Sequence, residues 1–240
     1  YVLSENINNL LSRIENAIDR EKQFTSDASH ELRTPLAVIK GTMEVLIRKP
    51  RNQQEYEEKI QFCISEVDRL NHMVDQLLLL ARFENQKQNV KQETIYLNAL
   101  ILDNLTRFSE KSESKKLKIK TEFTEDYYLV CDNYLVSIII SNLISNAIKY
   151  SNPNGEIAIE LGKTSDVVTF SITDYGVGIA KNDLDKIFNS FYRSDVTNHA
   201  EIKGTGLGLS IVKRRCDLLK LEIAVESKLN QGTTFILSFP

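Results

Sequence analysis

Residues 24–35 of this chain read Phe24-Thr-Ser-Asp-Ala-Ser-His-Glu-Leu-Arg-Thr-Pro35 and lie within a long helical pattern. His30 stands beside the carboxylate of Glu31, about one helical turn ahead of Pro35. Proline has no N–H to donate to the carbonyl of Glu31, and it pushes the residue before it away from helical geometry. The sequence therefore predicts a bend close to His30 that exposes the imidazole. A single histidine on a helix is more often an ordinary surface or core residue than a reactive one, so this run alone leaves both interpretations open.

Apolar residues recur around this run at alternating steps of three and four, the spacing of a coiled-coil seam. Residues 48–53 interrupt the pattern with charge and a proline, and a second seam follows. Two long helices joined by a short loop form an antiparallel hairpin. One hairpin cannot bury seams of this length, so we expect two copies to form a four-helix bundle, that is, a homodimer. The seam residues are Ile7, Leu10, Leu11, Ile14, Ala17, Ile18, Phe24, Leu36, Ile39, Met43 and Leu46, then Tyr56, Ile60, Cys63, Ile64, Val67, Leu70, Val74, Leu77, Leu78 and Ala81.

Beyond a polar stretch, helical and strand-like patterns alternate. The expected helices are 97–111, 133–150, 181–189 and 208–219, and the expected strands are 118–123, 127–131, 156–162, 167–173, 222–227 and 233–239. This order predicts an α+β protein whose second part is an α/β sandwich, with a mixed sheet and helices on one face. We expect a helical hairpin domain over residues 1–85, a linker over 86–94 and a second domain over 95–240.

The composition is that of an ordinary globular protein, and a net charge of −3 gives no reason to expect nucleic-acid binding. The three cysteines are far apart and show neither metal-type spacing nor a disulfide framework, which favours a reducing compartment. No apolar run approaches the roughly 20 residues that span a bilayer. The chain begins without Met in the middle of a helical pattern, so we expect it to be a fragment with further segments upstream.

The expected helix 133–150 carries polar residues on the side away from its apolar face. Asn142, Asn146, Lys149 and Tyr150 recur at steps of four, three and one. Amide oxygens suit Mg²⁺, which takes much of its shell from water and nucleotide phosphates. Lys149 could neutralise a phosphate, and Tyr150 could supply a flat surface or a hydroxyl. A helix with solvated asparagines explains the pattern about equally well.

Two glycine-containing loops follow. Asp174-Tyr-Gly-Val-Gly178 comes directly after an expected strand, where the carboxylate of Asp174 could accept a hydrogen bond from an exocyclic amine such as that of adenine. A plain strand-to-helix turn remains the alternative. Gly204-Thr-Gly-Leu-Gly208 opens a helix and could present N–H groups to an anion. The long polar segment before it resembles a lid, with positive charge from Arg193 and Lys203 at its two ends.

Together and in this order, these motifs resemble those of the sensor histidine kinases of two-component systems. Residues 30–35 resemble their H-box, 142–150 their N-box, 174–178 their G1 box, 187–193 their F-box and 204–209 their G2 box. The resemblance covers roughly residues 5–239. One departure is Leu219-Lys-Leu221, where the family often has a His-Gly-Gly-like turn.

The resemblance implies a protein histidine kinase that uses ATP and Mg²⁺. His30 would be the phosphoacceptor, assisted by Glu31, and Thr34 would serve dephosphorylation of the partner. Asn146 would hold the metal. The nucleotide site would consist of Asn142, Asn146, Lys149, Tyr150, Asp174, Gly176, Gly178, Arg193, Gly204, Thr205, Gly206, Leu207, Gly208 and Thr234.

The resemblance also implies a biological setting: a homodimer that passes phosphate to the aspartate of a response regulator receiver domain and also removes it. We expect the cytoplasmic portion of a membrane-anchored bacterial sensor, attached to the membrane only through absent upstream segments. Two rivals are an ATPase of the wider superfamily, such as a chaperone or topoisomerase subunit, and a degenerate kinase kept as a dimeric scaffold. The histidine-bearing hairpin argues against the first. Intact Asn146, Asp174 and loop glycines argue against the second, which would bind no ATP.

Overall fold

The computed structural model describes residues 2–81, 90–194 and 204–240. Its internal contacts divide the chain into two units, Tyr1–Leu77 and Leu78–Pro240. The first unit is helical, and the second contains all of the described strands. No helix among the described residues is both long enough and apolar enough to cross a membrane.

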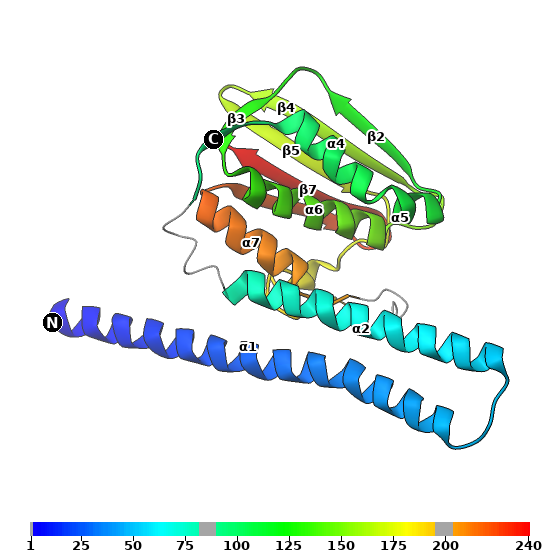
Figure 1. The fold of residues 1–240 in the computed structure, drawn as a ribbon. Coiled ribbons are helices and arrows are strands. Elements are labelled where there is room, and N and C mark those ends of the chain that lie inside the picture. Colours follow the sequence, from blue (N-terminus) through cyan, green and yellow to red (C-terminus); the bar gives the residue numbers. More distant parts are fainter. Residues whose placement is uncertain (1, 82–89, 195–203) are drawn as a thin grey trace. The chain divides into compact units, whose positions relative to one another are not determined.

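The first unit is an antiparallel hairpin of α1 (Val2–Ile47) and α2 (Gln53–Ala81), joined by a short loop (Figure 1). Asn52 caps the start of α2, since its Oδ1 accepts from the N–H of Glu55 at 2.8 Å and its Nδ2 donates to the carboxylate of Glu55 at 3.2 Å. Such a reciprocal cap satisfies N–H groups that have no partner within the helix. The predicted loop over residues 48–53 is confirmed, except that Gln53 already belongs to α2.

α1 continues through Pro35, so the proline does not break the helix. A proline inside a helix costs about 3 kcal/mol, because one backbone hydrogen bond is lost and the ring crowds the preceding turn. His30 is nevertheless exposed, as predicted. The hydroxyl of Thr34 donates to the carbonyl of His30 at 3.1 Å, which places the two residues one turn apart on the helix.

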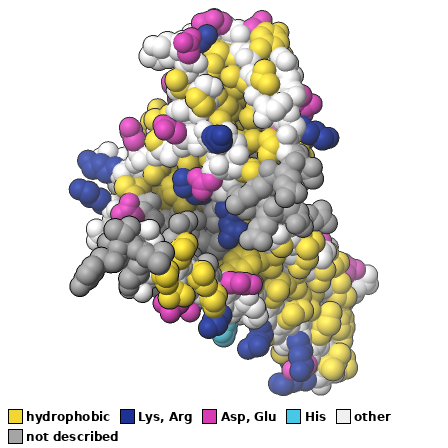
Figure 2. Space-filling view, turned by 90° about the vertical axis from the view of Figure 1, so that its left-hand side faces the viewer, with side chains coloured by type: hydrophobic (Ala, Val, Ile, Leu, Met, Phe, Trp, Pro, Cys, Tyr) yellow, Lys and Arg dark blue, Asp and Glu magenta, His cyan; other side chains and the backbone are white. Residues whose placement is uncertain are grey.

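The seams of the hairpin are incompletely covered within one chain. Many apolar side chains on both helices are 40–56% exposed, and such surface apolar side chains are visible in Figure 2. They include Ile7, Leu10, Leu11, Ile14, Ile18, Leu36, Met43, Ile60, Ile64, Val67, Val74 and Leu78. Contiguous apolar surface of this extent marks an interaction surface.

The second unit is built on a five-stranded mixed sheet of order β2-β4-β5-β7-β6 (Figure 1). β2 and β4 pair in parallel, and the other neighbours are antiparallel. The strands are β2 (Lys118–Phe123), β4 (Glu156–Thr164), β5 (Val167–Asp174), β6 (Glu222–Lys228) and β7 (Gly232–Phe239). β1 (Glu93–Tyr96) and β3 (Tyr128–Cys131) form a separate antiparallel pair.

Three helices cover one face of the five-stranded sheet: α4 (Leu97–Arg107), α6 (Asn133–Tyr150) and α7 (Gly208–Leu219) (Figure 1). α6 is the central helix, in contact with both of the others and with β5. The core between the helices and the sheet contains Ile139, Ile140, Leu143 and Ile144 of α6 together with Ile157, Ile159, Phe170, Ile172 and Leu237 of the strands. The sheet is therefore buried on the face that carries α6, as the sequence predicts.

Several predicted boundaries differ from the structure. The expected helix 97–111 is interrupted at Phe108, after which a short α5 (Ser109–Ser114) follows. The prediction of a helix over 181–189 was wrong: only the short 3₁₀ turn η1 (Lys181–Asp183) is helical, and the N–H groups of Lys186 and Asn189 bond three residues back. Lys220 adopts φ +58° after α7, so a non-glycine residue makes the turn in which the sequence departs from the family pattern.

Replacement of Phe170 by Ala tests the placement of the sheet. Phe170 is fully buried in β5, and emptying such a site costs about 3–5 kcal/mol of unfolding free energy. Urea denaturation followed by circular dichroism should show a loss of that size in the transition of the second unit. Val130→Ala is the control, since Val130 is 68% exposed and should change stability by less than about 0.5 kcal/mol. Similar losses for the two variants would contradict the core described here.

Candidate functional site

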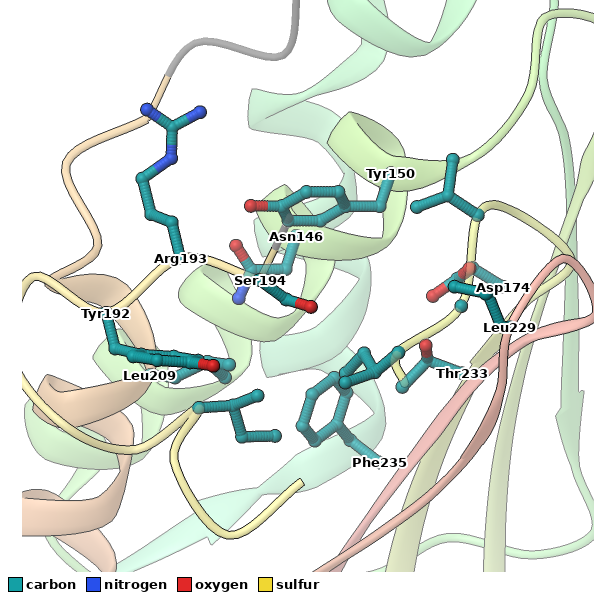
Figure 3. A pocket seen from close by; sticks show the side chains of 14 residues that line it. Asn146, Tyr150, Asp174, Tyr192, Arg193, Ser194, Leu209, Leu229, Thr233 and Phe235 are labelled. Atoms are coloured by element: carbon teal, nitrogen blue, oxygen red, sulfur yellow. The ribbon is translucent and has the colours of Figure 1, made fainter. Parts of the chain in front are cut away.

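A pocket in the second unit brings together residues from four of the predicted motifs (Figure 3). Asn146 and Tyr150 come from α6, Asp174 and Gly178 from the end of β5 and its loop, and Arg193 from the segment after η1. The remaining lining residues, most of them apolar, are Val177, Ile179, Ile187, Tyr192, Ser194, Leu209, Leu229, Thr233 and Phe235. A mainly apolar pocket with a few convergent polar groups is typical of a small-molecule site.

The periodicity of α6 decides which of its residues reach the pocket. Leu143, Ala147 and Ile148 are buried, so the helix turns Asn146 and Tyr150 toward the cavity. Asn142 lies one turn earlier, where its Nδ2 donates to the carbonyl of Ile138 at 2.8 Å. Asn142 does not line the pocket, and its Oδ1 faces the start of α7, 3.0 Å from where a β-carbon of Gly208 would lie.

Lys149 and Tyr150 form a second polar group beside the pocket. The Nζ of Lys149 lies 3.2 Å from the hydroxyl of Tyr150 and 4.7 Å from the centre of its ring. It also lies against Gly204, where a β-carbon would come within 2.0 Å of it. Burial raises the pKa of the Tyr150 hydroxyl, while the charge of Arg193 lowers it. The phenol is therefore neutral at pH 7, and two cations lie near it.

Asp174 is a buried carboxylate at the carboxyl end of β5. Its side chain lines the pocket although the residue is only 4% exposed, and its Oδ1 accepts from the N–H of Gly176 at 3.0 Å. Burial raises the pKa of Asp174 to about 6, and backbone hydrogen bonds from Gly176 and Thr233 oppose that rise. A buried acceptor among apolar walls is suited to a polar N–H group on a flat apolar ligand.

The hairpin between β6 and β7 fixes the loop that follows Asp174. The hydroxyl of Ser227 accepts from the N–H of Ile179 at 2.8 Å and bonds the carbonyl of Gly232 at the same distance. The N–H of Asn230 donates to the carbonyl of Val177 at 2.7 Å. These bonds bring Leu229 to the pocket from a part of the sequence that carries no motif.

The glycine-rich segment 204–208 leads into α7 and is held by hydrogen bonds both within the segment and to Phe191. Leu207 is fully buried, and its N–H donates to the hydroxyl of Thr205 at 3.3 Å. Gly206 has φ +71°, and its carbonyl accepts from the N–H of Phe191, against whose backbone a β-carbon would clash. Only glycine fits this approach of two segments. Lys203 and the remainder of 195–203 lie outside the described residues.

Asp183 is a site residue that the sequence did not reveal. Its carboxylate accepts from the hydroxyl of Tyr192 at 2.7 Å and from the hydroxyl of Ser194. This fixes the backbone on both sides of Arg193, so that Arg193 lies at the pocket. In the sequence Asp183 is one carboxylate in a polar stretch and belongs to no motif, so nothing there distinguishes it from its neighbours.

Thr234, which the resemblance assigns to the nucleotide site, does not line the pocket. Its hydroxyl lies 2.9 Å from the hydroxyl of Thr173 on the neighbouring strand. Side chains alternate along a strand, so Thr233 and Phe235 point to the pocket and Thr234 to the opposite face. Thr233, one residue earlier, lines the pocket.

His30, Glu31 and Thr34 belong to the other unit, on α1. His30 and Thr34 are exposed and Glu31 is partly buried. Successive helical residues do not face each other, and within the described part of the chain no hydrogen bond joins Glu31 to the imidazole. The imidazole is thus presented at the surface of the hairpin.

The residues of the pocket fit a metal ion that is bound mainly by a phosphate-bearing substrate and water, with few protein ligands. The described residues contain no group of three or more His, Cys, Asp or Glu side chains that could hold a metal alone. Asn146 instead offers one amide oxygen at the pocket. Mg²⁺ keeps several waters and commonly takes only one or two protein ligands beside substrate phosphates, so this donor set suits Mg²⁺.

Comparison with family models gives two matches. Residues 20–86 match the model of the His Kinase A (phospho-acceptor) domain. Residues 131–240 match the model described as histidine kinase-, DNA gyrase B- and HSP90-like ATPase. The first match contains His30, and the second contains every residue that lines the pocket.

Known proteins give the same assignment. The chain is 32% identical over 233 residues to the sensor protein IrlS of Burkholderia pseudomallei, and 30% identical over 249 residues to the signal transduction histidine-protein kinase ArlS of Staphylococcus aureus. These alignments cover 97% and 99% of the chain, which spans about half the length of these curated relatives (50% and 52%). The solved structure of the histidine kinase AdeS of Acinetobacter baumannii superposes with a TM-score of 0.69 at 26% identity, covering 88% of this chain and 96% of that one.

The buried carboxylate predicts a pH-dependent stability. The pKa of Asp174 is raised from its ordinary 3.8 to about 6, so the folded protein binds this proton more tightly than the unfolded chain. The charged form of Asp174 therefore lowers the unfolding free energy above pH 6, and this destabilisation disappears as the pH falls toward 4. Asp174→Asn should raise the unfolding free energy at pH 7.5 by about 1–3 kcal/mol, and the gain should shrink toward pH 4.

Urea denaturation at a series of pH values measures this difference. Asp103→Asn is the matched control, because Asp103 is exposed on α4. If the Asp174 and Asp103 variants gave the same pH profile, Asp174 would not carry the burial cost described here.

Proposed function

Since the chain belongs to the sensor histidine kinases, we propose that it transfers the γ-phosphoryl group of ATP to His30 and then to an aspartate of a response regulator receiver domain. The observation that carries the proposal is the pocket itself, in which Asn146, Asp174 and Arg193 meet from distant parts of the sequence. The imidazole of His30 is exposed, so a receiver domain could reach it for the second step, the transfer of phosphate to an aspartate. The activity and partners of the longer protein are part of this proposal.

The pocket suits the adenine base of ATP. Asp174, ionised at pH 7.5, accepts a hydrogen bond from the exocyclic amine of the base. The apolar walls, among them Ile179 and Phe235, enclose the ring, and Tyr150 offers a flat surface beside it. A site that hydrogen-bonds one amine rejects a base that lacks it, because the buried carboxylate is then left unpaired.

Cationic and amide groups beside the adenine position serve the phosphates. Lys149 and Arg193 would neutralise phosphate charge, and Asn146, with Asn142 one turn away, would hold Mg²⁺. When bound, Mg²⁺ supplies charge neutralisation of the phosphate oxygens. The segment Gly204–Gly208 lies at the start of α7, where backbone N–H groups and the helix dipole favour an anion. Phosphoryl transfer depends mainly on such positioning and charge neutralisation.

His30 is the nucleophile in this proposal. One ring nitrogen attacks the γ-phosphorus, a P–N bond forms, the bond between γ-phosphorus and the β,γ-bridging oxygen breaks, and ADP leaves. The proton on the other ring nitrogen passes to Glu31 or water. Glu31 does not touch the ring here, and catalytic hydrogen bonds of this kind often form only with substrate bound.

The hairpin supports a homodimer. Apolar side chains along α1 and α2 are half exposed within one chain, including Ile14 and Leu36 of α1 and Ile64 of α2. Pairing of two hairpins into a four-helix bundle buries these faces. We place the sensor and any membrane anchor in the portion of the relatives' length that this chain does not span.

A kinase is favoured over an ATPase of the wider superfamily by the first unit. Residues 20–86 match the phosphoacceptor family model, and an ATPase that works through hydrolysis alone has no use for that hairpin. The retained Asp174 and Asn146 in the pocket favour an active enzyme over a scaffold.

Replacement of His30 by Gln tests the transfer. The parent chain, incubated with Mg²⁺ and γ-labelled ATP, should acquire acid-labile, base-stable label, and His30→Gln should lose it completely while binding nucleotide as before. His72→Gln in α2 is the control, and it should label like the parent. Persistent labelling of the His30 variant would overturn the assignment of the phosphoacceptor.

Replacement of Thr34 by Ala separates the two activities. The exposed hydroxyl lies one turn beyond His30, where it could position a water against a phosphorylated aspartate. Thr34→Ala should leave autophosphorylation within about twofold and slow dephosphorylation of the regulator by about tenfold or more. The two rates are measured by label on the kinase and by loss of label from the purified regulator. Equal losses in both rates would contradict the separate role of Thr34.

A further inference from the structure

We propose that Lys115 is a positioning residue for the nucleotide pocket, because its ammonium group fixes the end of the helix that carries Asn146, Lys149 and Tyr150. This inference rests on the function proposed above and adds a residue from outside all five motifs. Lys115 lies between α5 and β2, and it does not line the pocket.

The ammonium group of Lys115 bonds three carbonyls at the C-terminal end of α6. Its Nζ donates to Lys149 at 2.8 Å, to Ile148 at 3.0 Å and to Ser151 at 3.1 Å. The last carbonyls of a helix have no partner within it, and they carry the negative end of the helix dipole. Where it meets these carbonyls the ammonium group is partly withdrawn from water, and this burial lowers the pKa of Lys115. The contact is thus a charge-assisted cap.

The one remaining carbonyl in this stretch is bonded from the pocket side. The carbonyl of Tyr150 accepts from the N–H of Val177 at 3.2 Å. The approach is close, since a β-carbon at Gly176 would lie 2.0 Å from the same oxygen. The end of α6 is therefore held between Lys115 on one side and the loop after Asp174 on the other. Loosening of this turn would displace Tyr150 and the loop together.

Lys115 is itself held in place. Its carbonyl accepts from the N–H of Asn154 at 2.9 Å, and the N–H of Lys118 donates to Gly155 at 2.9 Å. The backbone that carries Lys115 is thereby bonded to the turn that leaves α6. The cap therefore has a fixed base, which a positioning residue requires.

Three carbonyls converging on one nitrogen favour lysine in particular. An ammonium group has three donors on a single atom, whereas a guanidinium group spreads its donors over a planar fork. Arginine at this position keeps the charge but cannot bond all three oxygens from one atom. We therefore expect arginine to restore the function of Lys115 in part.

The experiment compares Lys115→Met, Lys115→Arg and the control Lys118→Met in the full 240-residue chain. Lys118 is an exposed lysine three residues away on β2. Lys115→Met should raise the KM for ATP in autophosphorylation and the Kd for ADP with Mg²⁺ by about tenfold, with kcat within about threefold. Lys115→Arg should give intermediate values, and Lys118→Met should match the parent. Circular dichroism at 25 °C establishes that each variant is folded when binding is measured.

A purely structural role would lower the melting temperature of Lys115→Met without changing the Kd of the folded protein, and that result would overturn the proposal. If Lys115→Met does not fold, the arginine variant decides: binding as tight as in the parent overturns the proposal, and weaker binding supports it. Failure of the parent chain itself to bind ADP would count against the proposed function, which separates that failure from one confined to Lys115.

Discussion

The packing of α6 against the sheet is the constraint on which the rest of the second unit depends. Ile139, Ile140, Leu143 and Ile144 are fully buried, and they fix the rotation of the helix about its axis. Because the helical period is 3.6 residues, this rotation also determines where the polar residues between them point. Asn146 reaches the pocket for the same reason that Leu143 reaches the core. The site is thus a consequence of core packing on its own helix.

The register between β5 and β7 determines which strand residues line the pocket opposite α6. β5 and β7 pair with Asp174 opposite Thr233, so the end of one strand and the start of the next meet at the pocket. The period of two along β7 then sends Thr233 inward and Thr234 to the other face. A shift of one residue would exchange them. Sequence patterns establish that a strand is present more securely than they establish which of its residues face the pocket, so the resemblance alone named Thr234, while the structure places Thr233 at the pocket.

Much of this could be predicted because local chemistry and tertiary structure agree. The apolar stripe predicted α6 with both of its ends, and the helix 208–219 also matches. The predicted helix 181–189 failed, because its short-range pattern is satisfied instead by turns around Asp183. Leu229 could not be predicted at all, since only the folding of a hairpin onto a distant loop brings it to the pocket.

The charged carboxylate of Asp174 lowers folding stability, which explains why the loop beside it is held by several hydrogen bonds. A carboxyl with a pKa raised to about 6 is charged at pH 7.5 at an expense of about 2–3 kcal/mol in folding stability. That charge persists only if the surrounding backbone is held by other interactions. Ser227 bonds the loop to the hairpin on one side, and the end of α6 bonds it on the other. In the function proposed here, a ligand amine that pairs with Asp174 would relieve the same cost, so the buried carboxylate that lowers folding stability would also select the bound base.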